Sequence, residues 1–206
     1  MGNRPTFEIE NSCGHPIVYG VDEVGRGPLA GPVVAAAVYI PHEKRNHPVW
    51  KEVRDSKQIS EVKREILFPI IQSQSVFGMG MANVEEIDEI NILQATFLAM
   101  RRAIESCAEC PDMLLIDGNR SPKNWPWDAR TVVKGDSVSV SIAAASILAK
   151  VTRDKMMAEL AAEFPAYGWA DNAGYGTPAH LDALNRFGAT PHHRKSFAPV
   201  KNLLAA

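Results

Sequence analysis

The stretch that most constrains the fold runs from residue 17 to residue 40, IVYGVDEVGRGPLAGPVVAAAVYI. Two apolar runs flank a turn rich in glycine and proline, so we expect strands at 18–24 and 33–40, joined as a hairpin with a wide loop. Asp22 and Glu23 stand at the end of the first run. Burying two carboxylates between hydrophobic strands costs several kcal/mol unless something pairs with them, and a bound cation is the usual compensation. The segment therefore predicts half of a metal site.

The rest of the chain alternates between strand and helix patterns. We expect further strands at 76–82, 113–116 and 131–133, and helices at 60–73, 90–107, 137–164 and 177–187. Pro69 should shorten or kink the first of these helices, and Pro165 should end the long one. The order of elements predicts an α/β protein with a central mixed β-sheet flanked by helices. We expect a core at 1–165 and a small C-terminal helical region at 166–206 packed on that core.

Composition excludes several classes of protein. The formal net charge is −2 over 206 residues, so the chain is not a strongly basic protein that binds nucleic acid by charge alone. Its apolar runs are too short to span a membrane, and residues 1–16 lack the apolar segment of a signal peptide. Three cysteines fit a reducing compartment, and we interpret the Cys107-x-x-Cys110 spacing as incidental. We therefore expect a cytoplasmic protein with no membrane partner.

Four acidic residues stand where an expected element ends: Asp22, Glu23, Asp117 and Asp136. Carboxylates near one sheet edge can converge on hard divalent cations, which prefer oxygen ligands. Two such ions about 4 Å apart can bind both the attacking and the leaving oxygen of a phosphodiester displacement. Because neighbouring side chains of a regular strand point to opposite faces, Asp22 and Glu23 can share a site only if the strand breaks there, which Gly25 permits.

Each feature also has an ordinary interpretation. Asp136 would be a good N-cap for a helix beginning at Ser137, and Asp117 followed by glycine is a good turn. A glycine-rich turn after a strand can bind a dinucleotide, but the G-x-G-x-x-x-G spacing and the prolines disfavour this.

The sequence does not decide between a functional and a structural role for the basic side chains and the histidines. Lys57, Lys150 and Arg194 are candidate phosphate contacts, and equally candidates for ordinary surface cations. His192 and His193 are expected on the surface or in packing, because a hard cation prefers oxygen ligands.

Several long blocks follow one another along the chain: YGVDEVGRGPLAGPVVAAAV, Asp55-Ser56-Lys57, LLIDGN, KGDSVSVSIAAASILAKVTRD, and GYGTPAHLDAL followed by HHRKSFAPV. Together they span residues 19–200 and resemble the bacterial ribonuclease HII family, the type 2 ribonucleases H. The resemblance implies a ribonuclease H-like fold. It also implies an endoribonuclease that hydrolyses the RNA strand of RNA–DNA hybrids, including single ribonucleotides embedded in duplex DNA.

The same resemblance implies the reaction chemistry. It places the family's metal ligands and catalytic carboxylates on the four acids, with Mn²⁺ or Mg²⁺ as cofactor. We expect Asp22 to bridge or orient two ions, Glu23 and Asp117 to complete their coordination, and Asp136 to bind the ion that activates water. The alternatives are a hybrid-binding module without catalysis and a related nuclease that acts on damaged DNA.

The resemblance finally implies how the substrate is recognised. Gly25, Arg26 and Gly27 match a motif that reads the ribose 2′-OH at an RNA–DNA junction, and glycines allow close backbone approach. Tyr175 matches a tyrosine that stacks on the sugar of the following deoxynucleotide. Ala173 departs from the family, since many members have a basic residue there, which puts one phosphate contact in doubt. We expect a monomer whose partner is an RNA–DNA hybrid or ribonucleotide-containing duplex DNA.

Overall fold

The computed structural model describes residues 4–122 and 124–205. Its centre is a five-stranded sheet with the strand order β3-β2-β1-β4-β5. The strands are β1 (Val18–Val24), β2 (Val33–Tyr39), β3 (Val76–Ala82), β4 (Met113–Asp117) and β5 (Ala129–Val132). The first three form an antiparallel meander, whereas β4 runs parallel to β1 and β5 parallel to β4. The predicted hairpin and the predicted mixed sheet are both confirmed.

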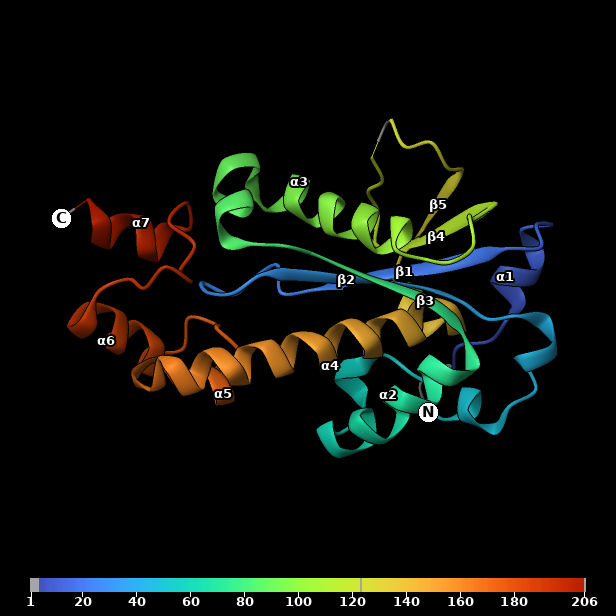
Figure 1. Ribbon diagram of the computed structural model, residues 1–206, viewed down its shortest axis with the longest axis horizontal. Helices are drawn as coiled ribbons and strands as arrows, with labels where there is room; N and C mark the ends of the chain where they lie inside the picture. Colours follow the sequence, from blue (N-terminus) through green and yellow to red (C-terminus); the bar gives the residue numbers. More distant parts are fainter. Residues whose placement is uncertain (1–3, 123, 206) are drawn as a thin grey trace.

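Helices cover both faces of this sheet (Figure 1). They are α1 (Glu8–Ser12), α2 (Glu61–Gln74), α3 (Val84–Glu105), α4 (Val140–Glu163), α5 (Trp169–Asn172), α6 (Pro178–Phe187) and α7 (Ala198–Leu204). α3 lies on one face, and α4 with α2 lies on the other, so a separate apolar cluster fills each interface. The helices α6 and α7 lie beyond the end of the sheet where β1 finishes.

Small residues let α4 approach the sheet closely. Ala143, Ala144 and Ala145 are fully buried in the cluster between α4 and the sheet. A Cβ atom on Gly20 in β1 would overlap the backbone at Ser141 near the start of α4, so only glycine fits there. This close packing fixes the start of α4 against the middle of β1, and the acids follow a few residues later on that strand.

Two predicted helices differ from expectation. Pro69 lies inside α2 without ending it, and α2 continues to Gln74. α3 begins earlier than predicted, because Asn83 and Glu86 form a reciprocal capping box, and it contains a kink at Asn91.

The C-terminal region contains three short helices where the sequence predicted one. The predicted helix at 177–187 corresponds to α6, and α5 and α7 were missed because helices of 4 and 7 residues carry little periodic signal. The domain boundary at residue 165 stays a prediction. Across the described part of the chain, none of the helices has the length and apolar character needed to cross a membrane.

Candidate active site

The ends of β1 and β4 form the centre of the candidate active site. The two strands are parallel, and their pairing ends at Val21 opposite Ile116. Asp22 and Glu23 come next on β1, and Asp117 comes next on β4. Three of the four predicted acids are therefore neighbours because parallel strands end at the same edge of the sheet, where α/β proteins commonly bind ligands.

Asp22 and Glu23 leave the sheet on opposite faces. β1 stays paired with β2 through Val24, with Asp22 opposite Ala36 and Glu23 opposite Ala35. Ala36 belongs to the apolar cluster on the α4 side and Ala35 to the cluster on the α3 side. The prediction that the strand must break is therefore wrong. Both carboxylates nevertheless line one cavity, because the β1–β4 pairing ends beside them and a side chain from either face reaches its open edge.

Asp117 is joined by a hydrogen bond to the turn that carries Asp136. The backbone N–H of Gly135 donates to Asp117 Oδ1 at 2.7 Å. Lys134, one residue earlier, has a left-handed backbone with φ of 55°, which turns the chain away from β5. Asp136 then lies in the 3₁₀ turn Gly135–Ser137. This hydrogen bond sets the spacing between the third and fourth acids.

Asp136 does not cap a helix. α4 begins at Val140, and its N-cap is Ser139, whose hydroxyl accepts a hydrogen bond from the N–H of Ile142 at 3.2 Å. The predicted helix start at Ser137, and with it the capping interpretation of Asp136, is wrong. The reason is local, because the turn after β5 needs three more residues before the chain can enter the helix.

A cavity of about 340 Å³ joins the four acids to other predicted contacts. Lys57, Lys150 and Tyr175 lie around its wall together with all four carboxylates. A second cavity of about 340 Å³ shares Glu23 and Asp117 and has Arg26 on its wall. The structure thus brings together eight of the predicted site residues around two adjoining cavities, one on each side of the sheet edge.

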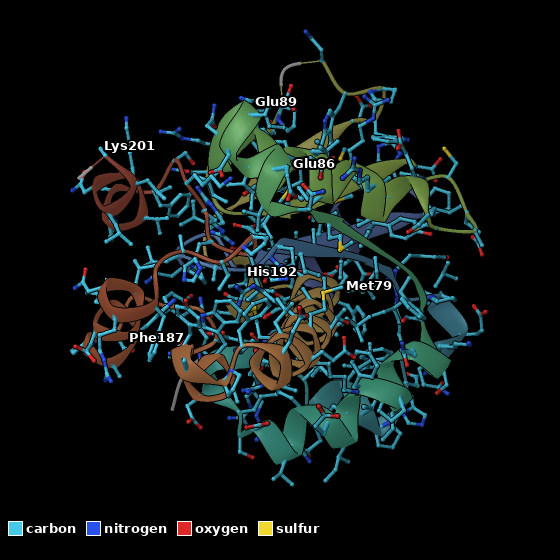
Figure 2. The ribbon with its side chains drawn as sticks, turned by 60° about the vertical axis from the view of Figure 1, so that its left-hand side comes forward. Met79, Glu86, Glu89, Phe187, His192 and Lys201 are labelled. Atoms are coloured by element: carbon cyan, nitrogen blue, oxygen red, sulfur yellow. The ribbon has the colours of Figure 1, made fainter. Side chains whose placement is uncertain are left out.

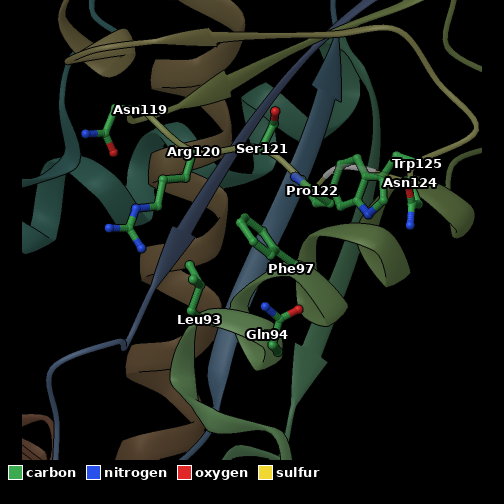
Figure 3. A pocket seen from close by; sticks show the side chains of 9 residues that line it. All are labelled: Leu93, Gln94, Phe97, Asn119, Arg120, Ser121, Pro122, Asn124 and Trp125. Carbon is green, nitrogen blue, oxygen red and sulfur yellow. The ribbon is translucent and has the colours of Figure 1, made fainter.

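The second cavity continues into a larger one of about 810 Å³ (Figure 3). The two share Leu93 and Phe97 of α3, and Asn119 and Arg120 from the segment after β4. Figure 3 shows these side chains facing one another across the space, with Trp125 at the far end. A groove with polar and aromatic walls therefore leads away from the acids along α3.

The crowding of carboxylates changes their acidity. Burial raises the pKa of Asp22 well above its ordinary value, and the negative charges of Glu23, Asp117 and Asp136 raise it further. Burial also raises the pKa of Glu23, although Arg26 opposes this with a contact of 3.3 Å between Arg26 NH1 and Glu23 Oε1. The pKa of Asp136 rises to about 6, chiefly through burial and then through the charges of Asp55 and Asp117. A site in which these groups repel one another favours a bound cation.

The glycine-rich loop after β1 lies against Tyr175. Gly25 has φ of 93°, a conformation that favours glycine, and a Cβ atom there would overlap the guanidinium of Arg153. A Cβ atom on Gly27 would lie 3.2 Å from Cε1 of Tyr175. Tyr175 is 49% exposed, so one face of its ring is open beside the loop. The loop and the aromatic ring form one surface next to the acids.

Arg194 does not lie where a phosphate can reach it. Its side chain is 0% exposed. The guanidinium donates to the carbonyl oxygens of Gly25, Arg26 and Gly31 at 2.6 to 3.0 Å. The predicted phosphate contact is therefore corrected: Arg194 holds the glycine-rich loop from behind. Of the two histidines before it, His193 is fully buried in packing and His192 is partly buried, as expected.

Sequence reasoning missed three side chains at the cavity. Ser56 and Ser146 are joined by a hydrogen bond of 2.7 Å and face the acids. Arg153 of α4 is 1% exposed and donates to the carbonyls of Ala30, Pro32 and Ala173. Its position in the charged second half of a helix pattern gave no signal, because a mid-helix arginine is usually solvent-exposed.

The donor set of the site suits a hard divalent ion. All four candidate ligands are carboxylates, and no sulfur or imidazole lines the cavity. Asp22 accepts only one hydrogen bond, from the N–H of Glu23 at 2.7 Å, which leaves its charge largely uncompensated among the described residues. Within residues 4–122 and 124–205, no three acidic, histidine or cysteine side chains are arranged to hold a metal ion as they stand.

Comparison with known proteins gives the family. The family model for ribonuclease HII matches residues 19–200. The chain belongs to the ribonuclease HII family. The ribonuclease HII of Paramagnetospirillum magneticum is 56% identical over 196 residues, which cover 95% of this chain and 96% of the relative. The ribonuclease HII of Anaplasma marginale is 48% identical, with 98% and 84% covered. The chain is therefore a ribonuclease H, a metal-dependent endonuclease with activity on RNA–DNA hybrids, and the predicted family and enzyme class are confirmed.

Solved structures agree on the fold. The ribonuclease H2 of Pyrococcus horikoshii OT3 superposes with a TM-score of 0.73 at 26% identity, covering 91% of this chain and 96% of that one. The structure of Bst-RNase HIII in complex with Mn²⁺ superposes with a TM-score of 0.71 at 20% identity, covering 98% of this chain and 73% of that one, which shows a shared fold. The predicted ribonuclease H-like fold is confirmed.

Proposed function

We propose that this ribonuclease HII hydrolyses the RNA strand of hybrids and also cuts at single ribonucleotides embedded in duplex DNA, by two-metal-ion phosphodiester hydrolysis. One observation carries the proposal. Four carboxylates from three separate segments line one cavity, and the glycine-rich loop and Tyr175 lie directly beside it. The carboxylates that would carry the reaction therefore lie beside the loop and the ring that would recognise a ribonucleotide.

Asp22, Glu23, Asp117 and Asp136 are the residues that would hold Mn²⁺ or Mg²⁺. When bound, such ions stabilise charge on the attacking and leaving oxygens of the phosphodiester. The protein's part is to hold the four carboxylates at the correct spacing, and the bound cations would offset the burial and repulsion that raise the pKa of Asp22, Glu23 and Asp136. The Gly135–Asp117 hydrogen bond sets one spacing, and the regular pairing of β1 sets another. Lys57 and Lys150 stand on the same wall as candidate phosphate contacts, and the 2.6 Å ion pair of Lys150 with Asp154 orients that side chain.

The loop and the tyrosine would choose the bond to be cut. The 2′-OH is the group that distinguishes RNA from DNA, and backbone groups flanked by glycine can approach it closely. The open ring of Tyr175 beside Gly27 can pack on the neighbouring sugar, so that a deoxynucleotide fits next to the ribonucleotide. The groove along α3 provides further surface on the opposite side of the sheet edge. A monomeric state and a cytoplasmic location stay predictions.

Matched duplexes with zero, one and four ribonucleotides in one strand test this proposal. We expect cleavage of the second and third with Mn²⁺ or Mg²⁺, and none of the all-DNA duplex. Binding should differ little among the three, because most affinity comes from backbone phosphates that they share. Efficient cutting of all-DNA duplex would instead support a nuclease for damaged DNA, and binding without cleavage of any duplex would support a hybrid-binding module.

A further inference from the structure

Two buried histidines lie behind Tyr175. His180 of α6 and His193 are both 0% exposed, and so is Trp169, which packs against them. In Figure 2 the neighbouring His192 marks this region, between the C-terminal helices and the end of the sheet. Neither histidine lines a cavity that contains the acids. The reaction chemistry therefore leaves them without a role.

Their hydrogen bonds fix the proton positions of both rings. The backbone N–H of Thr190 donates to His193 Nδ1 at 3.0 Å, so in a neutral ring the proton of His193 is on Nε2. That N–H donates to His180 Nε2, 3.0 Å away. Trp169 Nε1–H donates to the same His180 Nε2 at 3.1 Å, so the proton of His180 is on Nδ1. His180 Nδ1–H then donates to the carbonyl oxygen of Tyr175 at 2.9 Å.

This single assignment satisfies every ring nitrogen of the pair. Both rings are neutral near pH 7, because burial lowers the pKa of His180 and of His193. The hydrogen bonds therefore run in one direction, from the N–H of Thr190 to the carbonyl of Tyr175. Replacing either imidazole therefore alters the hydrogen bonds that end at the Tyr175 carbonyl.

The hydrogen bond from His180 restrains the part of this segment that other contacts do not hold. Before Tyr175, the N–H of Leu29 donates to the Gly174 carbonyl at 2.8 Å, and the N–H of Tyr175 donates to the Asn172 carbonyl at 2.9 Å. Tyr175 itself lies between Gly174, which has φ of 82°, and Gly176, and glycines restrict the backbone least. The ring is half exposed. Among the residues that the structure describes, the Tyr175 carbonyl accepts one further hydrogen bond, a short-range one from the N–H of Thr177 at 2.8 Å.

The same short segment also holds the glycine-rich loop. Arg194 follows His193 directly and donates to the carbonyls of Gly25, Arg26 and Gly31. The N–H of Arg194 in turn donates to the carbonyl of Leu29 at 2.8 Å. Residues 190–194, here called the brace, thus contact one substrate-reading element through a histidine pair and the other through an arginine.

We propose that His180 and His193 are positioning residues that hold Tyr175 in register with the Gly25–Gly27 loop and thereby set the preference of the enzyme for an RNA–DNA junction. The proposal rests on the proposed role of Tyr175 at that junction. It assigns the pair no contact with substrate or metal.

His180 offers a matched pair of variants. His180→Phe fills the space but removes both the donor to the Tyr175 carbonyl and the acceptor for Trp169 and His193. His180→Asn keeps an N–H close to the position of Nδ1. Tyr167→Phe is the control. It removes the hydrogen bond from Tyr167 Oη to Gly188 O at 2.8 Å, but it keeps the ring that packs against both histidines and leaves their hydrogen bonds unchanged.

The readout is kcat and KM on duplexes with one and with four ribonucleotides. For His180→Phe we expect the single-ribonucleotide preference to fall about 5-fold or more, the size of one lost stacking contact. The loss should appear mainly in KM, while kcat on four ribonucleotides stays within about 2-fold. His180→Asn should recover much of the preference, and Tyr167→Phe should keep it. Equal losses in His180→Phe and Tyr167→Phe would overturn the proposal.

A double-mutant cycle tests whether His180 acts through Tyr175. If it does, adding His180→Phe to Tyr175→Ala should change the preference no further, because the ring being positioned is already absent. Additive losses would show that the histidine acts by another route and would overturn the proposal.

Nitrogen NMR of the two imidazoles separates this inference from the function on which it rests. We expect an Nδ1–H tautomer for His180 and an Nε2–H tautomer for His193, and the reverse at His180 would overturn the proposal whatever the activity. If Tyr175→Ala leaves the preference unchanged, the proposed role of Tyr175 fails, and with it the claim that the pair sets specificity. The predicted tautomers would then stand as structure alone.

Discussion

Charged side chains are buried in two regions, at the acids that end β1 and in the brace behind Tyr175. The two regions differ in how many hydrogen-bond partners those side chains have. Asp22 accepts one hydrogen bond, from the adjacent backbone, and three other carboxylates surround it. Arg194 in the brace is equally buried, yet its guanidinium donates to three different carbonyl groups. The number of hydrogen-bond partners therefore distinguishes ligand-binding side chains from structural ones. Groups left without partners are available to bind a ligand, whereas fully partnered groups fix geometry.

The largest effect should come from removing a charge on the acid side. Asp22→Asn should reduce cleavage about 100-fold or more, because a neutral amide is a poor ligand for a hard divalent ion. The melting temperature of the metal-free protein should stay equal or rise, since repulsion among the carboxylates falls. Turnover with saturating Mn²⁺ and a thermal melt measure the two quantities. Wild-type turnover in a folded variant would remove Asp22 from the site.

Asp136→Asn tests whether a second acid of the site acts through its charge or through a structural role. Because Ser139 caps α4, Asp136 has no capping role to preserve, and its charge alone is at stake. We expect about a 10-fold or greater loss of activity, since a carboxylate ligand is lost, with little change in melting temperature. Ser139→Ala is the matched control. It removes the cap and the hydrogen bond from the Ser139 hydroxyl to the buried Glu10 carboxylate, so stability should fall by about 1–3 kcal/mol, with activity retained once the protein is folded. A lower melting temperature with retained activity in Asp136→Asn would show that Asp136 has a structural role.

On the brace side, Arg194→Lys should act on stability. A lysine ammonium cannot reach all the carbonyls that the planar guanidinium bridges, and each buried carbonyl left without a donor costs about 1–3 kcal/mol. We expect the free energy of unfolding in urea to fall by about 2–4 kcal/mol. Arg186→Lys, at an exposed ion pair with Asp182, should change it by less than about 0.5 kcal/mol. If the two variants are equally stable, the brace does not depend on Arg194.

The most gradual effect is a pH dependence of stability. Burial, then the charges of His180 and His192, lower the pKa of folded His193 to about 4, whereas an unfolded histidine titrates near about 6.5. The unfolded state therefore binds the proton first, so stability is intact above about pH 6.5 and falls as the pH drops toward 4. Each pH unit in that window should cost about 1.4 kcal/mol at most.

Urea unfolding of metal-free protein at several pH values measures this slope. The buried acids act in the opposite direction, because a raised carboxyl pKa favours the folded state on protonation. The test is therefore the difference between the wild type and His193→Gln. That variant keeps a donor near Nε2 but does not titrate, so the difference in stability should shrink below pH 6. A constant difference would show that His193 is not buried in the neutral form.

Much of the acid side could be predicted from the sequence. The apolar run that ends in Asp22 and Glu23, and the short strand that ends in Asp117, are local patterns, and parallel strands bring their ends together. That Asp22 and Glu23 line one cavity from opposite faces could not be predicted, because the sheet edge beside them forms only where β4 stops pairing. The first turn of α4 was also misplaced, since hydrophobic periodicity does not show that Ser139 is the N-cap.

The brace could not be predicted in the same way. The segment HHRKSF is locally basic, and a basic segment usually lies on the surface. Arg194 is buried only because its donors meet carbonyls on a loop 163 to 169 residues earlier in the chain. The tautomers of His180 and His193 depend on Thr190 and Trp169, which no sequence pattern links to them.

The distance in sequence between Arg194 and the loop it holds has a consequence for synthesis on the ribosome. The strands β1, β2 and β3 are consecutive and can pair early, but the loop at 25–31 has its guanidinium partner 169 residues away from Gly25. Loop closure over so many residues comes late in folding, and chains emerge with the N-terminus first. A nascent chain that has not yet reached Arg194 therefore carries all four acids but lacks the guanidinium that holds Gly25, Arg26 and Gly31. The substrate-reading surface is therefore completed only after residues 190–194 have been synthesised.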